Sequence, residues 1–167
     1  LQKNGTVLDI MSSWRSHLPD DVQLSKVVGI GLNQEEMGEN PQLDEAIVHD
    51  LNAEPTFPFP DCVFDTAIIS VSVQYITRPV ALFKEAGRVL KGGGSLHVFY
   101  SNRMFPTKAV AIWKVLDERQ RAGLVESYFR NSAEWRQVQS IDISRPAPRG
   151  SDPMFVVAGY KGVKECD

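Results

Sequence analysis

The sequence has few cysteines, no long apolar run and no run of charge of one sign. Its two cysteines, Cys62 and Cys166, form no CxxC pair of the kind that binds zinc or performs redox chemistry. The 18 basic and 21 acidic residues are spread along the chain, so the basic stripe typical of nucleic-acid-binding proteins is missing. The apolar runs are far shorter than a membrane span. We therefore expect no metal site, no nucleic-acid partner and no membrane-spanning segment.

The composition is that of an ordinary globular protein. The chain has 167 residues, of which 43% are hydrophobic and 23% are charged. This length suits one domain with a sizeable core, and we expect residues 1–167 to form a single domain. We expect a cytoplasmic or organellar (stromal) location, with targeting left open because the first residue is Leu1 and not methionine.

Apolar runs alternate with amphipathic stretches, which favours a parallel sheet flanked by helices. Thr77 is expected to cap a helix that has Pro79 in its first turn, and the glycines at 92–94 are expected to end it. A long helix is predicted over 107–122, with a short one after Gly123. Five strands are expected at Val7–Ile10, Lys26–Ile30, Glu45–His49, Thr66–Val71 and Ser95–Tyr100.

The last forty residues have a different pattern. Apolar and polar residues alternate over 137–144, and a further strand is predicted over 154–160. The connection at 145–153 is too short for a crossover helix, so these two strands should pair antiparallel. The predicted fold is therefore an α/β, Rossmann-like doubly wound sheet of five parallel strands with a C-terminal antiparallel hairpin.

Four segments carry a family resemblance. They are Val7-Leu8-Asp9, Val28-Gly29-Ile30, the run Phe-Pro-Phe-Pro-Asp-Cys-Val-Phe-Asp at 57–65, and Arg-Val-Leu-Lys-Gly-Gly-Gly at 88–94. In the residues of these four segments and in its strand order, the chain resembles the class I S-adenosylmethionine-dependent methyltransferases, in particular the type 11-like branch. The resemblance implies methyl transfer with S-adenosylmethionine as cofactor. In open parallel sheets, ligands bind beyond the carboxyl ends of the strands.

Two segments depart from the family pattern. Where the family has Asp-x-Gly-x-Gly-x-Gly, this chain has Asp-Ile-Met-Ser-Ser-Trp-Arg at 9–15, so all three glycines are replaced. A serine loop can still offer N–H and hydroxyl donors to the cofactor's carboxylate. Where the family has an acid for the ribose hydroxyls, this chain has Gly31. Asn33 is expected to cap a short helix with Glu36 completing a capping box, while Glu35 stays open as a substitute acid.

The resemblance and the strand ends together define the cofactor contacts. Asp50 and Leu51 follow the third strand, where the family binds the adenine. A carboxylate can accept from the exocyclic amine, but Asp50 could equally be a loop or cap residue. The predicted cofactor-binding residues are Asp9, Met11, Ser12, Ser13, Gly31, Asp50, Leu51 and Ser72.

Catalytic and substrate-binding candidates come from the same edge of the sheet. His17 is the general-base candidate, since imidazole titrates near neutral pH, although it could simply bond the backbone at a turn. Tyr75 could shape the methyl pocket, or pack on the following helix. Asn102 and Arg103 follow the fifth strand, where Arg103 could bind an acidic substrate or serve as a surface cation.

Three functions compete. The first is methyl transfer to a small-molecule substrate. The second is a non-catalytic binding or scaffold domain of the same fold, which the replaced glycines and the missing ribose acid favour. The third is a nicotinamide-dependent enzyme, which ranks last because GxGxxG after the first strand is missing. We expect the helices that usually cover the pocket to be absent, which would also allow self-association into a homo-oligomer.

Overall fold

The computed structural model describes residues 1–133, 135–144 and 152–163. Seven strands form one sheet in the order β3-β2-β1-β4-β5-β7-β6. Neighbouring strands from β3 to β5 run parallel, while β7 is antiparallel to both β5 and β6. The predicted class and the C-terminal hairpin are confirmed. The strands are β1 Thr6–Ile10, β2 Lys26–Gly31, β3 Glu45–Val48, β4 Phe64–Ser70, β5 Leu90–Ser101, β6 Trp135–Asp142 and β7 Met154–Lys161.

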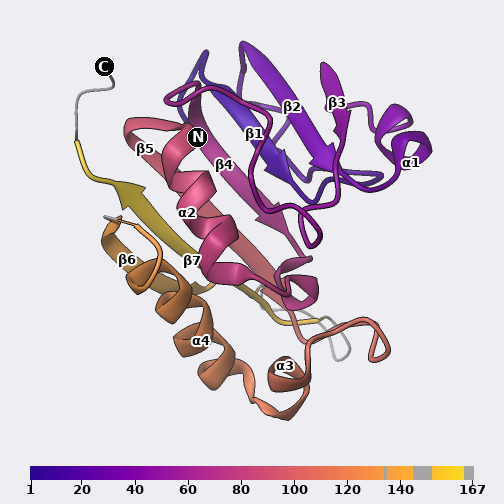
Figure 1. Cartoon of the computed structure of the whole chain (residues 1–167), viewed down its shortest axis with the longest axis vertical. Helices are drawn as coiled ribbons and strands as arrows, with labels where there is room; N and C mark the ends of the chain where they lie inside the picture. The colour runs from indigo at the N-terminus through magenta and orange to yellow at the C-terminus, as the bar shows by residue number, and fades with distance from the viewer. Residues whose placement is uncertain (134, 145–151, 164–167) are drawn as a thin grey trace.

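The helical segments are few and mostly short. They are α1 Gln34–Gly38, the 3-10 turn η1 Val73–Tyr75, α2 Pro79–Val89, α3 Ala111–Val115 and α4 Glu118–Arg130. The two long ones, α2 and α4, lie on the same side of the sheet (Figure 1). None of the helices in the described segments is long and apolar enough to cross a membrane.

The long helix predicted over 107–122 is wrong. Asp117 interrupts it: its carboxylate accepts from the backbone N–H of Gln120 at 2.8 Å, and the Gln120 side chain accepts from the Asp117 N–H at 3.0 Å. This reciprocal cap starts α4, while Leu116 is extended between the two helices. The helix predicted after Gly123 is therefore the C-terminal half of α4.

The ends of α2 also differ from the sequence prediction. Thr77 does not cap the helix; its hydroxyl donates to Asn52 at 3.0 Å, and Arg78 takes the N-cap position without a side-chain bond. Pro79 lies in the first turn, as predicted, and is the first residue of the helix. The helix ends at Val89, and the three glycines already belong to β5, where Gly93 has a φ of +80°.

Arg88, in the segment that resembles the family wording, ties α2 to the preceding loop. Its guanidinium donates to the Glu85 carboxylate at 2.7 Å and to Asp61 at 2.6 Å. It also donates to the carbonyl oxygens of Phe57 and Phe59. These contacts, with Glu85 first, hold the pKa of Arg88 above its usual range. The segments at 57–65 and 88–94 therefore meet in one structural clamp.

The two faces of the sheet are covered unequally. Residues that point to the helical side, such as Leu8, Ile69 and Val98, join a large core that includes α2 and α4. Alternate residues such as Val7 and Ile68 point to the other side and join a small cluster. The crossover from β1 to β2, residues 11–25, contains no helix. Parallel crossovers usually carry one, so this face is covered there by a loop alone.

Candidate functional site

A cleft of about 480 Å³ lies at the carboxyl ends of the parallel strands. Of the eight predicted cofactor-binding residues, seven line it: Met11, Ser12, Ser13, Gly31, Asp50, Leu51 and Ser72. The eighth, Asp9, lines a smaller side cavity of about 290 Å³ that shares Met11, Ser12 and Ser13 with the cleft. The fold therefore brings together residues that the sequence predicted to share a site.

Hydrogen bonds hold the loop that follows β1, in which the three family glycines are replaced. Asp9 is 1% exposed, and its carboxylate accepts from the Ser12 hydroxyl at 2.6 Å. The backbone N–H of Ser12 donates to the Ile30 carbonyl at 3.0 Å. Burial raises the pKa of Asp9 to about 6, although the hydroxyls of Ser12 and Ser16 oppose that shift. The loop is thus tied to the first two strands without any of the family's glycines.

Gly31 lies directly under this loop. A Cβ at position 31 would overlap the carbonyl oxygen of Ser12 and approach the Met37 sulfur to 3.1 Å. The end of β2 therefore has no room for the acid that the family places there. The path of the loop and the glycine are two parts of one local arrangement.

Glu36 occupies the same corner of the cleft. Its carboxylate accepts from the Ser13 hydroxyl and from the Asn33 side-chain amide, the latter at 2.9 Å. Asn33 caps α1 as predicted, accepting from the backbone of Glu35 and Glu36. The reciprocal half of the predicted capping box is wrong, because Glu36 bonds side chains and not the Asn33 backbone N–H. Glu36 lines the cleft and Glu35 does not.

Asp50 serves as a turn residue and still faces the cleft. One carboxylate oxygen, Oδ1, accepts from the backbone N–H groups of Asn52 at 3.0 Å and Ala53 at 3.1 Å. The neighbouring His49 bonds the Glu54 carbonyl through Nε2 at 2.8 Å. Both interpretations of Asp50 from the sequence are therefore compatible, because the turn uses only one oxygen.

Tyr75 and Ser72 line the cleft from the β4 side. The Tyr75 hydroxyl accepts from the backbone N–H of Phe105 at 3.0 Å, and the two rings lie 6.4 Å apart. The Ser72 hydroxyl is buried and has no hydrogen-bond partner among the described residues. A buried hydroxyl without a partner is costly, so a ligand that bonds Ser72 would remove this cost.

His17 lies outside the cleft but lines the side cavity, together with Asp9 and Trp14. Its φ is +57°, and two further residues near it, Met11 and Val71, also have positive φ. For a β-branched residue such as Val71 this backbone is unusual. Strained backbone of this kind clusters at functional sites.

Asn102 and Arg103 do not line the cleft or the side cavity. Arg103 forms an ion pair with Asp152 through Nε at 2.5 Å, and its side chain is 76% exposed. To bind an acidic substrate, Arg103 would have to exchange its ion pair with Asp152 for one with the substrate. The sequence could not show the pairing, because Asp152 is 49 residues away.

Several lining residues were missed by the sequence interpretation. Ser70 is the last residue of β4, Val71 follows it, and Lys108 lies in the loop between β5 and α3. Of these three residues, only Val71 has an unusual backbone conformation, a positive φ, and this conformation cannot be recognised from the sequence. The described residues contain no group of three His, Cys, Asp or Glu side chains that could hold a metal ion.

Comparison with known proteins identifies the family. The family model described as a methyltransferase domain matches residues 13–98, and the chain belongs to this family. No curated protein matches the sequence. The fold is similar to a SAM-dependent methyltransferase from Aquifex aeolicus, with a TM-score of 0.65 and 17% identity over 96% of this chain and 84% of that one.

Two further solved structures illustrate the range of the fold. One is the complex of the Haloferax volcanii Trm112 methyltransferase activator with a methyltransferase: TM-score 0.67, 16% identity, 100% of this chain and 86% of that one. The other is the [4+2]-cyclase SpnF, with a TM-score of 0.67 and 17% identity over 98% of this chain and 78% of that one. The fold is thus that of class I methyltransferases, while the reactions of its members differ.

Proposed function

We propose that this chain binds S-adenosylmethionine in the cleft and transfers its methyl group to a small-molecule acceptor. The observation that carries the proposal is the convergence of Met11–Ser13, Gly31, Asp50–Leu51 and Ser72 on one cleft at the carboxyl ends of the parallel strands. The cleft also has a size suited to a small ligand. When bound, this cofactor supplies an electrophilic methyl group on a sulfonium that keeps the bond electrons as the methyl leaves.

The residues of the cleft fit such a cofactor. The unpartnered Ser72 hydroxyl can bond a polar group of the ligand, and Oδ2 of Asp50 is available to accept from the adenine amine. Glu36 can accept from the ribose hydroxyls in place of the acid that Gly31 excludes. The acidic side chains Glu36 and Asp50 also favour a ligand that carries positive charge at its centre.

The chain's part in the chemistry is to position the two reactants and to accept a proton. Orientation alone supplies much of the rate enhancement of a two-substrate reaction. Tyr75 is held by Phe105 at the wall of the cleft, where it can limit how the acceptor approaches. His17, at the side cavity, can accept the proton that the acceptor loses.

A non-catalytic binding domain is the second candidate. The loss of the three family glycines and of the ribose acid favours it, because both losses weaken what the family uses to hold the cofactor. Such a domain would bind its ligand without consuming it.

Titration calorimetry with S-adenosylmethionine and S-adenosylhomocysteine tests the proposal. We expect saturable binding of both, and slow formation of S-adenosylhomocysteine when an acceptor is present. No heat and no thermal shift at millimolar ligand would refute the proposed function. Binding without turnover against a broad acceptor panel would favour the non-catalytic domain.

A further inference from the structure

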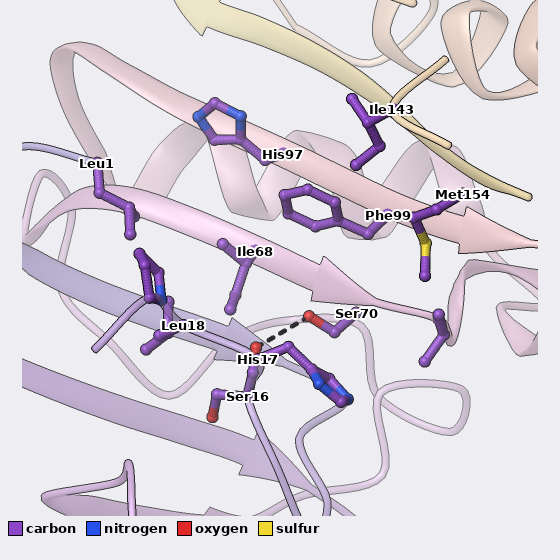
Figure 2. Close-up of a pocket in the computed structure, with 12 residues that line it drawn as sticks. Leu1, Ser16, His17, Leu18, Ile68, Ser70, His97, Phe99, Ile143 and Met154 are labelled. Carbon is purple, nitrogen blue, oxygen red and sulfur yellow. Dashed lines mark hydrogen bonds between the residues drawn. The ribbon is translucent and has the colours of Figure 1, made fainter. Parts of the chain in front are cut away.

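The face of the sheet opposite α2 and α4 carries a groove of about 440 Å³ (Figure 2). It lies where the crossover from β1 to β2 brings only a loop over strands β1, β4 and β5. Its floor is apolar, with Ile68 from β4 and Phe99 from β5, and its sides are Leu18 from the loop and Met154 from β7. Ile143, just after β6, closes one side.

No charged side chain lines this groove among the described residues. Its polar side chains are those of Ser16, His17, Ser70 and His97. The Ser70 hydroxyl donates to the Ser16 carbonyl at 3.2 Å, and Nε2 of His97 lies 2.9 Å from the Ser95 hydroxyl. Burial, and after it the positive charge of the N-terminal amino group, lower the pKa of His97. An ionic ligand would lose its hydration here without a charged side chain to pair with it.

The groove and the cleft meet. Ser70 and Val71 line both of them, and His17 lines both the groove and the side cavity. A molecule seated on Ile68 and Phe99 would therefore have one end at the Ser70–Val71 corner, next to the proposed cofactor. The candidate base His17 stands at the same corner. The lining favours a ligand that is apolar along its length and polar at one end only.

We propose that this groove binds the body of the methyl acceptor, and that the acceptor is a neutral, largely apolar small molecule. The inference rests on the proposed function for the identity of the ligand as an acceptor. The groove has the volume and the apolar lining with few polar groups that are typical of small-molecule sites. Its continuity with the cleft separates it from an ordinary surface depression.

The test uses 2-naphthol as a neutral probe and 2-naphthoate as its anionic counterpart, on the full ¹⁵N-labelled chain. Saturable shifts are expected at the amides of Ser70, Val71 and Phe99 with 2-naphthol, and at least tenfold weaker binding with 2-naphthoate. The same shifts should persist with S-adenosylhomocysteine present, because the two ligands occupy adjoining sites. Displacement of the probe by S-adenosylhomocysteine would place it in the cleft and overturn the inference.

Two isoleucines provide a matched pair of variants. Ile143 lines the groove and is 41% exposed, whereas Ile141 is 48% exposed and lines a different depression beside Tyr100. Ile143→Glu should weaken 2-naphthol binding at least tenfold, and Ile141→Glu should leave it within twofold of the parent. Equal effects of the two variants would overturn the inference.

These experiments distinguish failure of the groove proposal from failure of the proposed function. Binding of S-adenosylmethionine with no saturable 2-naphthol shift overturns the groove proposal alone. Binding of 2-naphthol with no binding of S-adenosylmethionine supports the groove as a ligand site and overturns the proposed function. A dimer in sedimentation velocity that Ile143→Glu dissociates, and that excludes 2-naphthol, would assign the groove to a second copy of the chain and overturn the proposal.

Discussion

The backbone of Ser12 lies against Gly31, so closely that a Cβ at position 31 would overlap the Ser12 carbonyl oxygen. Two departures from the family pattern, 19 residues apart in the sequence, are therefore one structural adjustment. The loop without glycines crosses the space in which the family's ribose-binding acid would stand. Restoring that acid alone is incompatible with the path of the loop.

Gly31→Ala should destabilise the protein by about 1–3 kcal/mol, since the added methyl meets backbone that cannot move aside easily. Gly123→Ala is the matched control, because Gly123 lies in α4 with open space around its Cβ position. The control should raise the free energy of unfolding by about 0.5–1 kcal/mol through helix propensity. Urea unfolding followed by circular dichroism measures both. A Gly31→Ala protein as stable as the parent would contradict the packing described here.

Glu36→Gln should weaken S-adenosylmethionine binding about tenfold, as expected for loss of a charged hydrogen-bond acceptor. Glu35→Gln, one residue earlier on the same helix but outside the cleft lining, should leave the affinity unchanged. Titration calorimetry on the two variants makes the comparison. If both variants bind like the parent, the ribose hydroxyls are held elsewhere.

Asp50→Asn should also weaken S-adenosylmethionine binding about tenfold. The amide oxygen can keep the turn bonds to Asn52 and Ala53, so the change removes the charge and leaves the local fold in place. His49→Ala should have a smaller effect, because His49 Nε2 is bonded to the Glu54 carbonyl. Equal losses of affinity in the two variants would refute the assignment of Asp50 to the adenine.

Asp9→Asn should stabilise the protein at neutral pH. A pKa of about 6 in the folded state, against an ordinary value of 3.8, means that the folded protein holds this proton more tightly than the unfolded chain. Ionisation therefore costs the parent protein stability as pH rises, by up to about 3 kcal/mol at pH 7 and about half of that at pH 5. The advantage of the variant should grow from pH 5 to pH 7 in urea unfolding. An advantage that shrinks over this interval would contradict the burial argument.

Arg88→Lys should destabilise the protein by about 2–3 kcal/mol, because lysine cannot bond Glu85, Asp61 and two carbonyl groups at once. Arg130→Lys is the control: within the described part of the chain Arg130 pairs with Glu126 alone, and its side chain is 60% exposed. Exposed pairs contribute little, so the control should stay within about 0.5 kcal/mol. Thermal unfolding compares the two, and similar losses would argue against the clamp.

Much of the fold could be predicted from the sequence because each strand corresponds to a local apolar run or to an alternation of apolar and polar residues. All seven predicted strands exist, and each lies within a few residues of its predicted bounds, apart from an earlier start for β5. The prediction failed where one polar side chain outweighed an apolar periodicity. Asp117 starts a new helix within the range predicted as one long helix. Its reciprocal cap with Gln120 satisfies backbone N–H groups that the first turn of the new helix leaves without partners.

The candidate site was predicted less completely. Residues directly after strands, such as Asp50 and Ser72, could be found because parallel strands end at one edge. The overlap of Gly31 with Ser12, the ion pair of Arg103 with Asp152 and the arrival of Lys108 depend on how loops meet in space. No sequence spacing specifies these encounters. They follow from the path of the chain and need the structure.

The crossover from β1 to β2 has one further consequence, for local opening of the fold. On the helical side of the sheet, α2 and α4 can separate only by exposing a large common core, whereas the loop at 11–25 covers a cluster of few residues. Segments with few buried apolar contacts open at a lower free energy than the global transition. Amide hydrogen exchange should therefore be faster in this loop than in α2, so the side of the sheet on which we propose that the acceptor binds is also the side that opens first.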